Sequence, residues 1–176
     1  MAEIPSLLAH RADDLTRLHA AYVPSLAQID VRCGPHDAAR LGFPLRPNTV
    51  TGDMTRGVLW LGPDEWLVVG LPGSAAPILR ALEATLDGTH HSVVDVSASR
   101  AVIQMTAIER HRLLASGCSL DLDPRGGWLP DVCAQTLFAR APVLLQELVN
   151  ATRIFVRPSF ADHVVDRLLA VAEVRS

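Results

Sequence analysis

The sequence predicts a mixed α+β chain, with mostly antiparallel sheets and helices packed on them. Short apolar runs of period two alternate with amphipathic stretches of helical period, and single prolines and glycines separate them. In addition, one order of strand, proline, serine and amphipathic helix occurs twice, in WLVVGLPGSAAPILRAL (66–82) and in RIFVRPSFADHVVDRLL (153–169). The repeated order indicates two similar halves.

Residues 27–97 form the first predicted half. The alternating run AQIDVR (27–32) is typical of a half-buried strand. Pro35 then begins a short helix that ends at Gly42. Residues 43–57 are rich in proline, asparagine and glycine and predict an irregular connection.

A hairpin and a helix complete this half. Two apolar runs, at 58–61 and 66–70, flank the turn-forming residues GPDE. Ser74 is positioned to cap the next helix, which keeps its apolar spacing as far as Gly88. A strand at 92–96 follows. The resulting order, β-α-β-β-α-β, is that of a ferredoxin-like domain.

The second predicted half, residues 98–176, begins with the alternating strand AVIQMT (101–106). Thr106 and Glu109 have the spacing of a capping box. The helix that they would cap ends at Gly117, and a loop follows.

After that loop, three apolar runs predict three strands: CAQTLFA, VLLQELV and TRIFVR. Ser159 and Asp162 form a second predicted cap, for an amphipathic final helix. No strand follows this helix. We therefore expect the second half to lack its closing strand and to leave one sheet edge open.

Residues 1–26 are predicted to be an N-terminal extension, with a short helix that Pro24 ends. They contain no basic leader or apolar run of signal-peptide length, and no apolar stretch approaches the ~18 to 20 residues that span a bilayer. The formal net charge of −3 offers no basic surface for nucleic acid. We expect a cytoplasmic protein that binds neither membrane nor nucleic acid.

The cysteines and basic residues exclude several kinds of site. Cys33, Cys118 and Cys133 form no CxxC pair and are odd in number, which argues against a disulfide framework and a zinc knuckle. Cys118 follows a helix C-terminus, where the helix dipole opposes a thiolate. All 16 basic residues are arginine, so no lysine is present to form a Schiff base.

Other reactive side chains have structural interpretations. His90 and His91 are adjacent on an extended segment and point to opposite faces, so they do not grip one metal ion together with Asp95. Asp121 and Asp123 lie in a proline-ended loop, where turn formation is the expected role.

Nucleophile and phosphate motifs are also missing. Ser74 and Ser159 are predicted N-caps outside any G-x-S-x-G elbow. The glycines are scattered, and RGGW (125–128) neither follows a strand nor opens a helix. We predict no catalytic, metal-binding or cofactor-binding residue in this chain.

The tryptophans are the remaining candidates. Trp60, Trp66 and Trp128 are able to stack a flat ligand such as a pterin, but core or interface packing is the commoner role. The segment GGWLP has no strand or helix period that would bury Trp128, whereas Trp66 starts a core strand. We therefore expect an interface at Trp128, Trp66 and Arg125, with Trp128 as its better anchor.

Six blocks of the sequence resemble, in order, the gamma subunit of heterotetrameric sarcosine oxidase. They cover most of residues 27–173 and are LGFPLRPNTV, WLGPDEWLVV, VDVSASRAVIQM, LLASGCSLDLDPR, CAQTLFARAPVLL and RPSFADHVVDRLL. WLGPDEW and GCSLDLDP are the most specific. That family is similar to the N-terminal part of the glycine-cleavage T-protein, an aminomethyltransferase. The resemblance therefore implies a folate-binding fold made of two ferredoxin-like halves.

The resemblance also implies a complex. Such a complex oxidises sarcosine with oxygen to glycine and hydrogen peroxide, and it releases the one-carbon unit as formaldehyde or transfers it to tetrahydrofolate. The beta subunit would hold FAD, the alpha subunit NAD and the folate site, and the delta subunit zinc, with FMN between alpha and beta. This chain would be an accessory subunit packed mainly against alpha. None of the larger subunits' catalytic residues has a counterpart here, so we expect the isolated chain to be inactive and to bind none of these cofactors.

Two alternatives remain open. A stand-alone folate- or pterin-binding module would have the same fold. A sister complex acting on another N-methylated or imino acid would need a similar accessory subunit. The first 26 residues and residues 126–128 of the RGGW loop lie outside the six blocks, and they leave the second alternative open.

Overall fold

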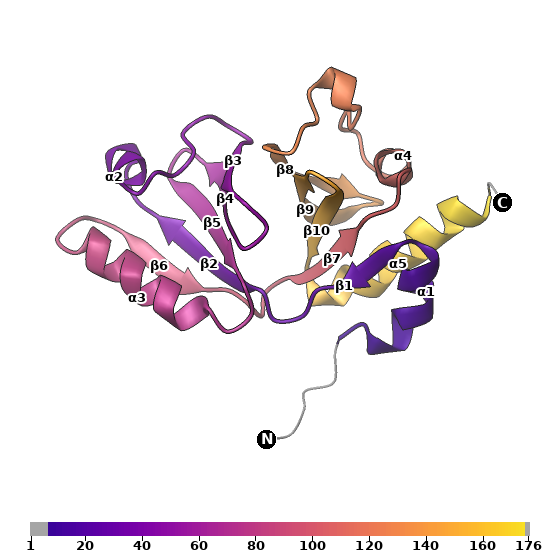
Figure 1. Cartoon of the computed structure of the whole chain (residues 1–176), viewed down its shortest axis with the longest axis horizontal. Helices are drawn as coiled ribbons and strands as arrows, with labels where there is room; N and C mark the ends of the chain where they lie inside the picture. Colours follow the sequence, from indigo (N-terminus) through magenta and orange to yellow (C-terminus); the bar gives the residue numbers. More distant parts are fainter. Residues whose placement is uncertain (1–6, 175–176) are drawn as a thin grey trace. The chain divides into compact units, whose positions relative to one another are not determined.

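The structure, a computed structural model, describes residues 7–174 and divides them into two compact units. Unit 1 contains residues 7–24, 99–130 and 135–174, and unit 2 contains residues 25–98 and 131–134. Each unit has one five-stranded sheet and its own helices (Figure 1). The predicted α+β class with mainly antiparallel sheets is confirmed.

Unit 2 follows the predicted order of elements with one exception: Val50–Gly52, inside the segment 43–57 that was predicted to be an irregular connection, forms a short strand. It contains β2 (Ala27–Arg32), α2 (Pro35–Arg40), β3 (Val50–Gly52), β4 (Arg56–Gly62), β5 (Glu65–Gly70), α3 (Ala75–Leu86) and β6 (Ser92–Asp95). The strands lie in the order β3-β4-β5-β2-β6, and each neighbouring pair is antiparallel. The predicted hairpin is β4 and β5, which pair around the GPDE turn.

The core of unit 2 is apolar. Ile29 and Val31, on one face of β2, pack in a buried cluster with Leu82 of α3. Trp66 is fully buried in the same cluster, and its ring centroid lies 5.9 Å from that of Phe43. Its Nε1 donates a 2.7 Å hydrogen bond to the carbonyl oxygen of Pro44. The irregular connection after α2 is therefore fixed to the core through this indole.

Unit 1 combines the two ends of the chain. It contains η1 (Ala9–Arg11), α1 (Ala12–Arg17), β1 (Ala20–Tyr22), β7 (Ala101–Met105), α4 (Arg110–Ala115), η2 (Pro124–Gly126), most of β8 (Cys133–Phe138), β9 (Ala141–Leu148), β10 (Ala151–Val156) and α5 (Pro158–Glu173). The strand order is β1-β7-β10-β9-β8. Helix α5 buries a stripe of four residues, Ala161, Val164, Val165 and Leu168.

The open sheet edge predicted for the second half is wrong at β7. Strand β1, which lies in the predicted N-terminal extension, pairs antiparallel with β7 through Ala20↔Met105 and Tyr22↔Ile103. The missing closing strand therefore comes from the beginning of the chain. A strand of three residues is too short to show a recognisable alternation of apolar and polar residues, and its partner strand lies far away in the sequence.

Both predicted capping boxes are also wrong. Helix α4 begins at Arg110, and Thr106 Oγ1 instead donates a 3.0 Å hydrogen bond to the carbonyl oxygen of His19, next to β1. Helix α5 begins at Pro158, so Ser159 lies inside its first turn and caps nothing. Proline at the first helical position, whose missing N–H would be unbonded in any case, fixes this start.

Ser74 does precede α3, but its hydroxyl makes no capping bond to the helix. It donates to the carbonyl oxygen of Leu71 at 2.6 Å. None of the helices among residues 7–174 is long and apolar enough to cross a membrane.

Candidate functional site

The structure does not gather the sequence-predicted metal candidates into a site. His91 Nδ1 lies 3.0 Å from the carbonyl oxygen of Thr89. Asp95 accepts hydrogen bonds from the hydroxyl and the backbone N–H of Ser97, which lower the pKa of its carboxyl. Within residues 7–174, no group of three or more His, Cys, Asp or Glu side chains is placed to hold a metal ion.

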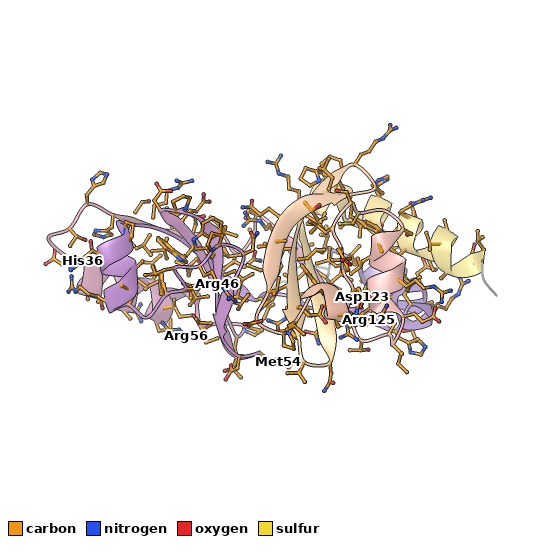
Figure 2. All side chains as sticks on the ribbon, turned by 90° about the horizontal axis from the view of Figure 1, so that it is seen from above. His36, Arg46, Met54, Arg56, Asp123 and Arg125 are labelled. Atoms are coloured by element: carbon orange, nitrogen blue, oxygen red, sulfur yellow. The ribbon has the colours of Figure 1, made fainter. Side chains whose placement is uncertain are left out.

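The paired carboxylates are turn-forming. Asp121 accepts the backbone N–H of Asp123 at 3.0 Å. Asp123 and Arg125 lie side by side in the loop (Figure 2), where Arg125 Nη2 donates to Asp123 Oδ2 at 2.6 Å. Hydrogen bonds from the Arg125 side chain and backbone lower the pKa of Asp123 to about 2. An acid this strong does not hold a proton to donate near neutral pH.

The thiols of Cys33 and Cys133 are not activated. Burial raises the pKa of Cys133 to about 12, and its Sγ lies 3.5 Å from the carbonyl oxygens of Thr49 and Trp60. Burial likewise raises the pKa of Cys33. These two thiols therefore remain protonated and unreactive.

Glu147 of β9 is a buried carboxylate with four hydrogen-bonding neighbours. Only 2% of it is exposed. Its Oε1 lies 2.8 Å from Arg110 Nη2 and 2.8 Å from His111 Nε2, both on α4. Its Oε2 accepts hydrogen bonds from Trp128 Nε1 at 2.9 Å and from the hydroxyl of Thr152.

Three parts of unit 1 meet at this carboxylate. The register of β9 and β10 places Thr152 directly opposite Glu147, so both side chains are on one face of the sheet. Helix α4 contributes the adjacent Arg110 and His111, and Arg110 Nε also donates to Thr152 Oγ1 at 3.2 Å. Trp128 comes from the loop that follows η2. We name these five residues the Glu147 cluster.

The Glu147 cluster joins α4, the loop after η2 and the strands β9 and β10 through hydrogen bonds. Each carboxylate oxygen has two hydrogen-bonding neighbours, and Arg110 balances the charge. Such full pairing is what a buried carboxylate requires. The cluster fixes α4 and the RGGW loop to the sheet.

The structure buries Trp128, although its segment was expected to have no period that would bury it. The residue is only 5% exposed, and its indole N–H donates a hydrogen bond to Glu147. Trp66 is fully buried as well. The interface expected at Trp128, Trp66 and Arg125 stays a prediction. Arg125 is different: 90% of its side chain is exposed. Glu147 was not predicted as a functional or structural site, although a single charge within the apolar run VLLQELV is a signal for a buried group with a partner.

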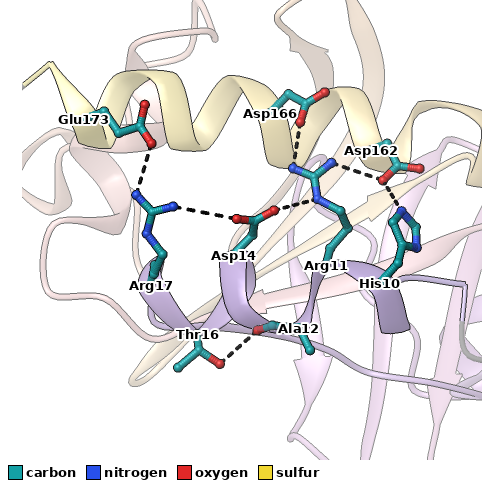
Figure 3. A network of polar contacts seen from close by, with 9 residues as sticks. All are labelled: His10, Arg11, Ala12, Asp14, Thr16, Arg17, Asp162, Asp166 and Glu173. Carbon is teal, nitrogen blue, oxygen red and sulfur yellow. Dashed lines mark hydrogen bonds and ion pairs between the residues drawn. The ribbon is translucent and has the colours of Figure 1, made fainter.

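A second polar network joins the N-terminal segment to α5 (Figure 3). Arg11 donates to Asp14 at 2.8 Å, to Asp162 at 3.1 Å and to Asp166 at 2.6 Å. Arg17 pairs with Glu173 at 3.0 Å. We call this set, together with His10, the Arg11 network.

The charges of the Arg11 network reinforce one another. Burial lowers the pKa of Arg11, but the hydrogen bonds to its three carboxylates outweigh this and raise it. Partial burial raises the pKa of Asp162, yet hydrogen bonds from His10 and Arg11 bring it below its usual value. These contacts hold η1 and α1, which directly precede β1, against α5. They therefore support β1, the strand that closes the sheet of unit 1.

The sequence has clear relatives. A family model for the sarcosine oxidase gamma subunit matches residues 26–173. The sarcosine oxidase subunit gamma of Corynebacterium sp. (strain U-96) is 34% identical over 134 residues, which cover 75% of this chain and 64% of the relative. The chain therefore spans just under two thirds of that curated relative. The subunit from Arthrobacter sp. is 32% identical over 152 residues, covering 81% of this chain and 73% of the relative.

Solved structures agree with the sequence relatives. A chain of the heterotetrameric sarcosine oxidase from Corynebacterium sp. U-96, in complex with pyrrole 2-carboxylate, matches with a TM-score of 0.86 and 30% identity. The match covers 97% of this chain and 96% of that chain. The glycine cleavage system aminomethyltransferase T from Bartonella henselae shares the fold, with a TM-score of 0.65 and 14% identity over 92% of this chain and 49% of that one. The chain belongs to the sarcosine oxidase gamma subunit family.

Proposed function

We propose that this chain is a structural subunit of a flavin-dependent heterotetrameric sarcosine oxidase and has no active site of its own. The observation that carries the proposal is the likeness, over 97% of the chain, to a chain of a heterotetrameric sarcosine oxidase. The proposed complex oxidises sarcosine with oxygen to glycine and hydrogen peroxide. Its one-carbon unit leaves as formaldehyde or on tetrahydrofolate.

The cofactors of the proposed complex belong to its other subunits. FAD, FMN, NAD, tetrahydrofolate and zinc would be held by alpha, beta and delta, and this chain would pack mainly against alpha. The described side chains support this division of tasks. Glu147 and Asp123 are occupied by internal hydrogen bonds, and burial suppresses the thiolates of Cys33 and Cys133.

A cavity near α1 and α4 does not change this interpretation. It has a volume of about 480 Å³ and lies in unit 1, between the residues after α1 and those before α4. Leu18, Ile108 and Leu113 give it much of its lining. His19 and Glu109 also border it, but no hydrogen bond joins these two side chains to each other or to a nucleophile among the described contacts. It has no arrangement of acid, base and nucleophile.

Co-expression with the alpha, beta and delta subunits tests the proposal. The tagged chain should copurify with all three and with their flavin absorbance, whereas the chain expressed alone should be colourless and should not turn over sarcosine. Stoichiometric flavin in the isolated chain would disprove the assignment, and so would failure of the wild-type chain to copurify. Titration of the isolated chain with tetrahydrofolate is the control for a stand-alone folate-binding module, and no saturable binding is expected.

A further inference from the structure

A small cavity of unit 1 is lined by two arginines and by no acidic residue. Its volume is about 180 Å³, and it lies where β7 begins and β10 ends. Arg100 and Arg157 provide its charge, Gln135 and Thr136 of β8 are polar neighbours, and apolar residues such as Phe155 complete the lining. The cavity therefore combines positive charge, hydrogen-bonding groups and an apolar surface.

The strand register explains why the two arginines meet. The last pair of β10 with β7 is Val156↔Ala101, and Arg157 and Arg100 are the next residues on each strand. Alternation along the strands puts both arginines on the face that also carries Phe155. Two like charges directly opposite each other destabilise a sheet. A carboxylate beside Arg157 would reduce this repulsion.

Arg157 is exposed, and it differs from two arginines of unit 1 that are paired with acidic side chains. Arg11 and Arg110 each donate to at least one carboxylate. The Arg157 side chain makes no hydrogen bond or ion pair with any residue of the described range 7–174, although it borders the cavity. Arg100 has other interactions in the chain, so Arg157 is the residue on which the inference rests.

We propose that this cavity binds one carboxylate group, with Arg157 as its principal ligand and Arg100 as the second cation. The planar guanidinium matches a carboxylate with two parallel N–H···O bonds. The volume is below the ~300 to 1,000 Å³ of pockets for larger ligands, which favours a short carboxylate over a flavin or a pterin. The carboxylate is either a free small acid or an Asp or Glu side chain of a partner subunit. The second source rests on the proposed function.

Glutarate titration of the isolated full-length chain tests the free-acid source. Calorimetry at low ionic strength should give saturable binding that weakens in 1 M NaCl, because salt screens the ion pair. Arg157→Gln should weaken binding at least tenfold, whereas Arg157→Lys, which keeps the charge without the planar fork, should weaken it less. Arg140→Gln is the matched control, because Arg140 is an exposed arginine outside the cavity. It should change affinity less than twofold. Circular dichroism melts establish that the variants are folded.

Assembly with the alpha, beta and delta subunits tests the partner source. If glutarate does not bind, Arg157→Gln should still weaken association with the partner subunits at least tenfold, and Arg140→Gln should not. The inference is overturned if glutarate does not bind and Arg157→Gln assembles like the wild type. If the wild-type chain fails to assemble at all, the proposed function fails, and the glutarate titration alone then decides the carboxylate site.

Discussion

Unit 2 builds its sheet from one continuous stretch of chain, residues 27–95, whereas unit 1 draws strands from both ends of the sequence. The core of unit 2 is apolar, with Ile29, Val31 and Trp66 at its centre. Unit 1 has apolar packing too, but it also buries the Glu147 cluster and depends on the Arg11 network to hold the helix beside β1. Two units with similar element orders are thus stabilised by different chemistry.

This difference has a physical consequence. Apolar packing is non-directional and responds little to pH or salt, whereas ion pairs and buried carboxylates depend on partners and protonation. Tryptophan residues allow the two units to be followed separately, because Trp60 and Trp66 belong to unit 2 and Trp128 belongs to unit 1. Fluorine-labelled tryptophan resonances therefore report the unfolding of each unit.

The largest effect is expected at the Glu147 cluster. Glu147→Ala leaves Arg110 buried without its carboxylate and should lower the free energy of unfolding by about 3 to 5 kcal/mol. Urea denaturation followed at the Trp128 resonance measures this loss. Glu109→Gln is the control, because Glu109 is exposed and directly precedes Arg110 at the start of α4. It should change the free energy of unfolding by no more than about 0.5 kcal/mol. An unchanged midpoint for Glu147→Ala would show that the cluster does not hold unit 1 together.

An apolar substitution should destabilise unit 2. Leu82 is almost completely buried in the core between α3 and the sheet, and Leu82→Ala should cost about 2 to 5 kcal/mol by leaving a cavity. The Trp66 resonance in urea is the measurement. The cost should be the same in 0.1 M and 1 M NaCl, unlike that of Arg11→Gln below. A strongly salt-dependent cost would contradict the contrast between the units.

A smaller effect is expected from the Arg11 network. Arg11→Gln removes three ion pairs, but Asp162 and Asp166 are more than half exposed and solvent screens them. The expected loss is about 1 kcal/mol in low salt and less in 1 M NaCl. Hydrogen exchange of the β1 amides should rise with this substitution, since the network supports that strand. If exchange in β1 stays at the wild-type rate, the network does not stabilise the closing strand.

The smallest effect is expected at Asp123. Its folded-state pKa of about 2 is below the ordinary aspartate value of 3.8. Its contribution to stability is therefore complete above about pH 4 and disappears as the pH falls through about 2. Carboxyl carbon NMR should detect the low pKa directly. Arg125→Gln should raise it toward the ordinary value, while the midpoint of unfolding at pH 7 barely moves; a pKa that stays near 2 would mean that Arg125 is not its cause.

Apart from the three-residue strand β3, the strands and helices of unit 2 were predictable because their signals are local. The alternation of AQIDVR, the GPDE turn and the apolar spacing of residues 75–86 each lie within one element. The same holds for the three strands and the final helix of unit 1. Periodicity decides which residues share a face, and a turn sequence decides where two strands reverse.

The closing strand, the helix starts and the buried cluster were decided only by the tertiary structure. Thr106 has the spacing of a cap, but its hydroxyl bonds to His19, 87 residues away. Trp128 lies in a segment with no strand or helix periodicity, yet it is buried, and its indole N–H donates a hydrogen bond to Glu147. Periodicity predicts on which face of its own helix or strand a residue lies. The hydrogen-bonding partner of a polar group is a non-local choice, because an unpaired buried group costs so much that the fold must bring a partner to it from wherever the chain provides one.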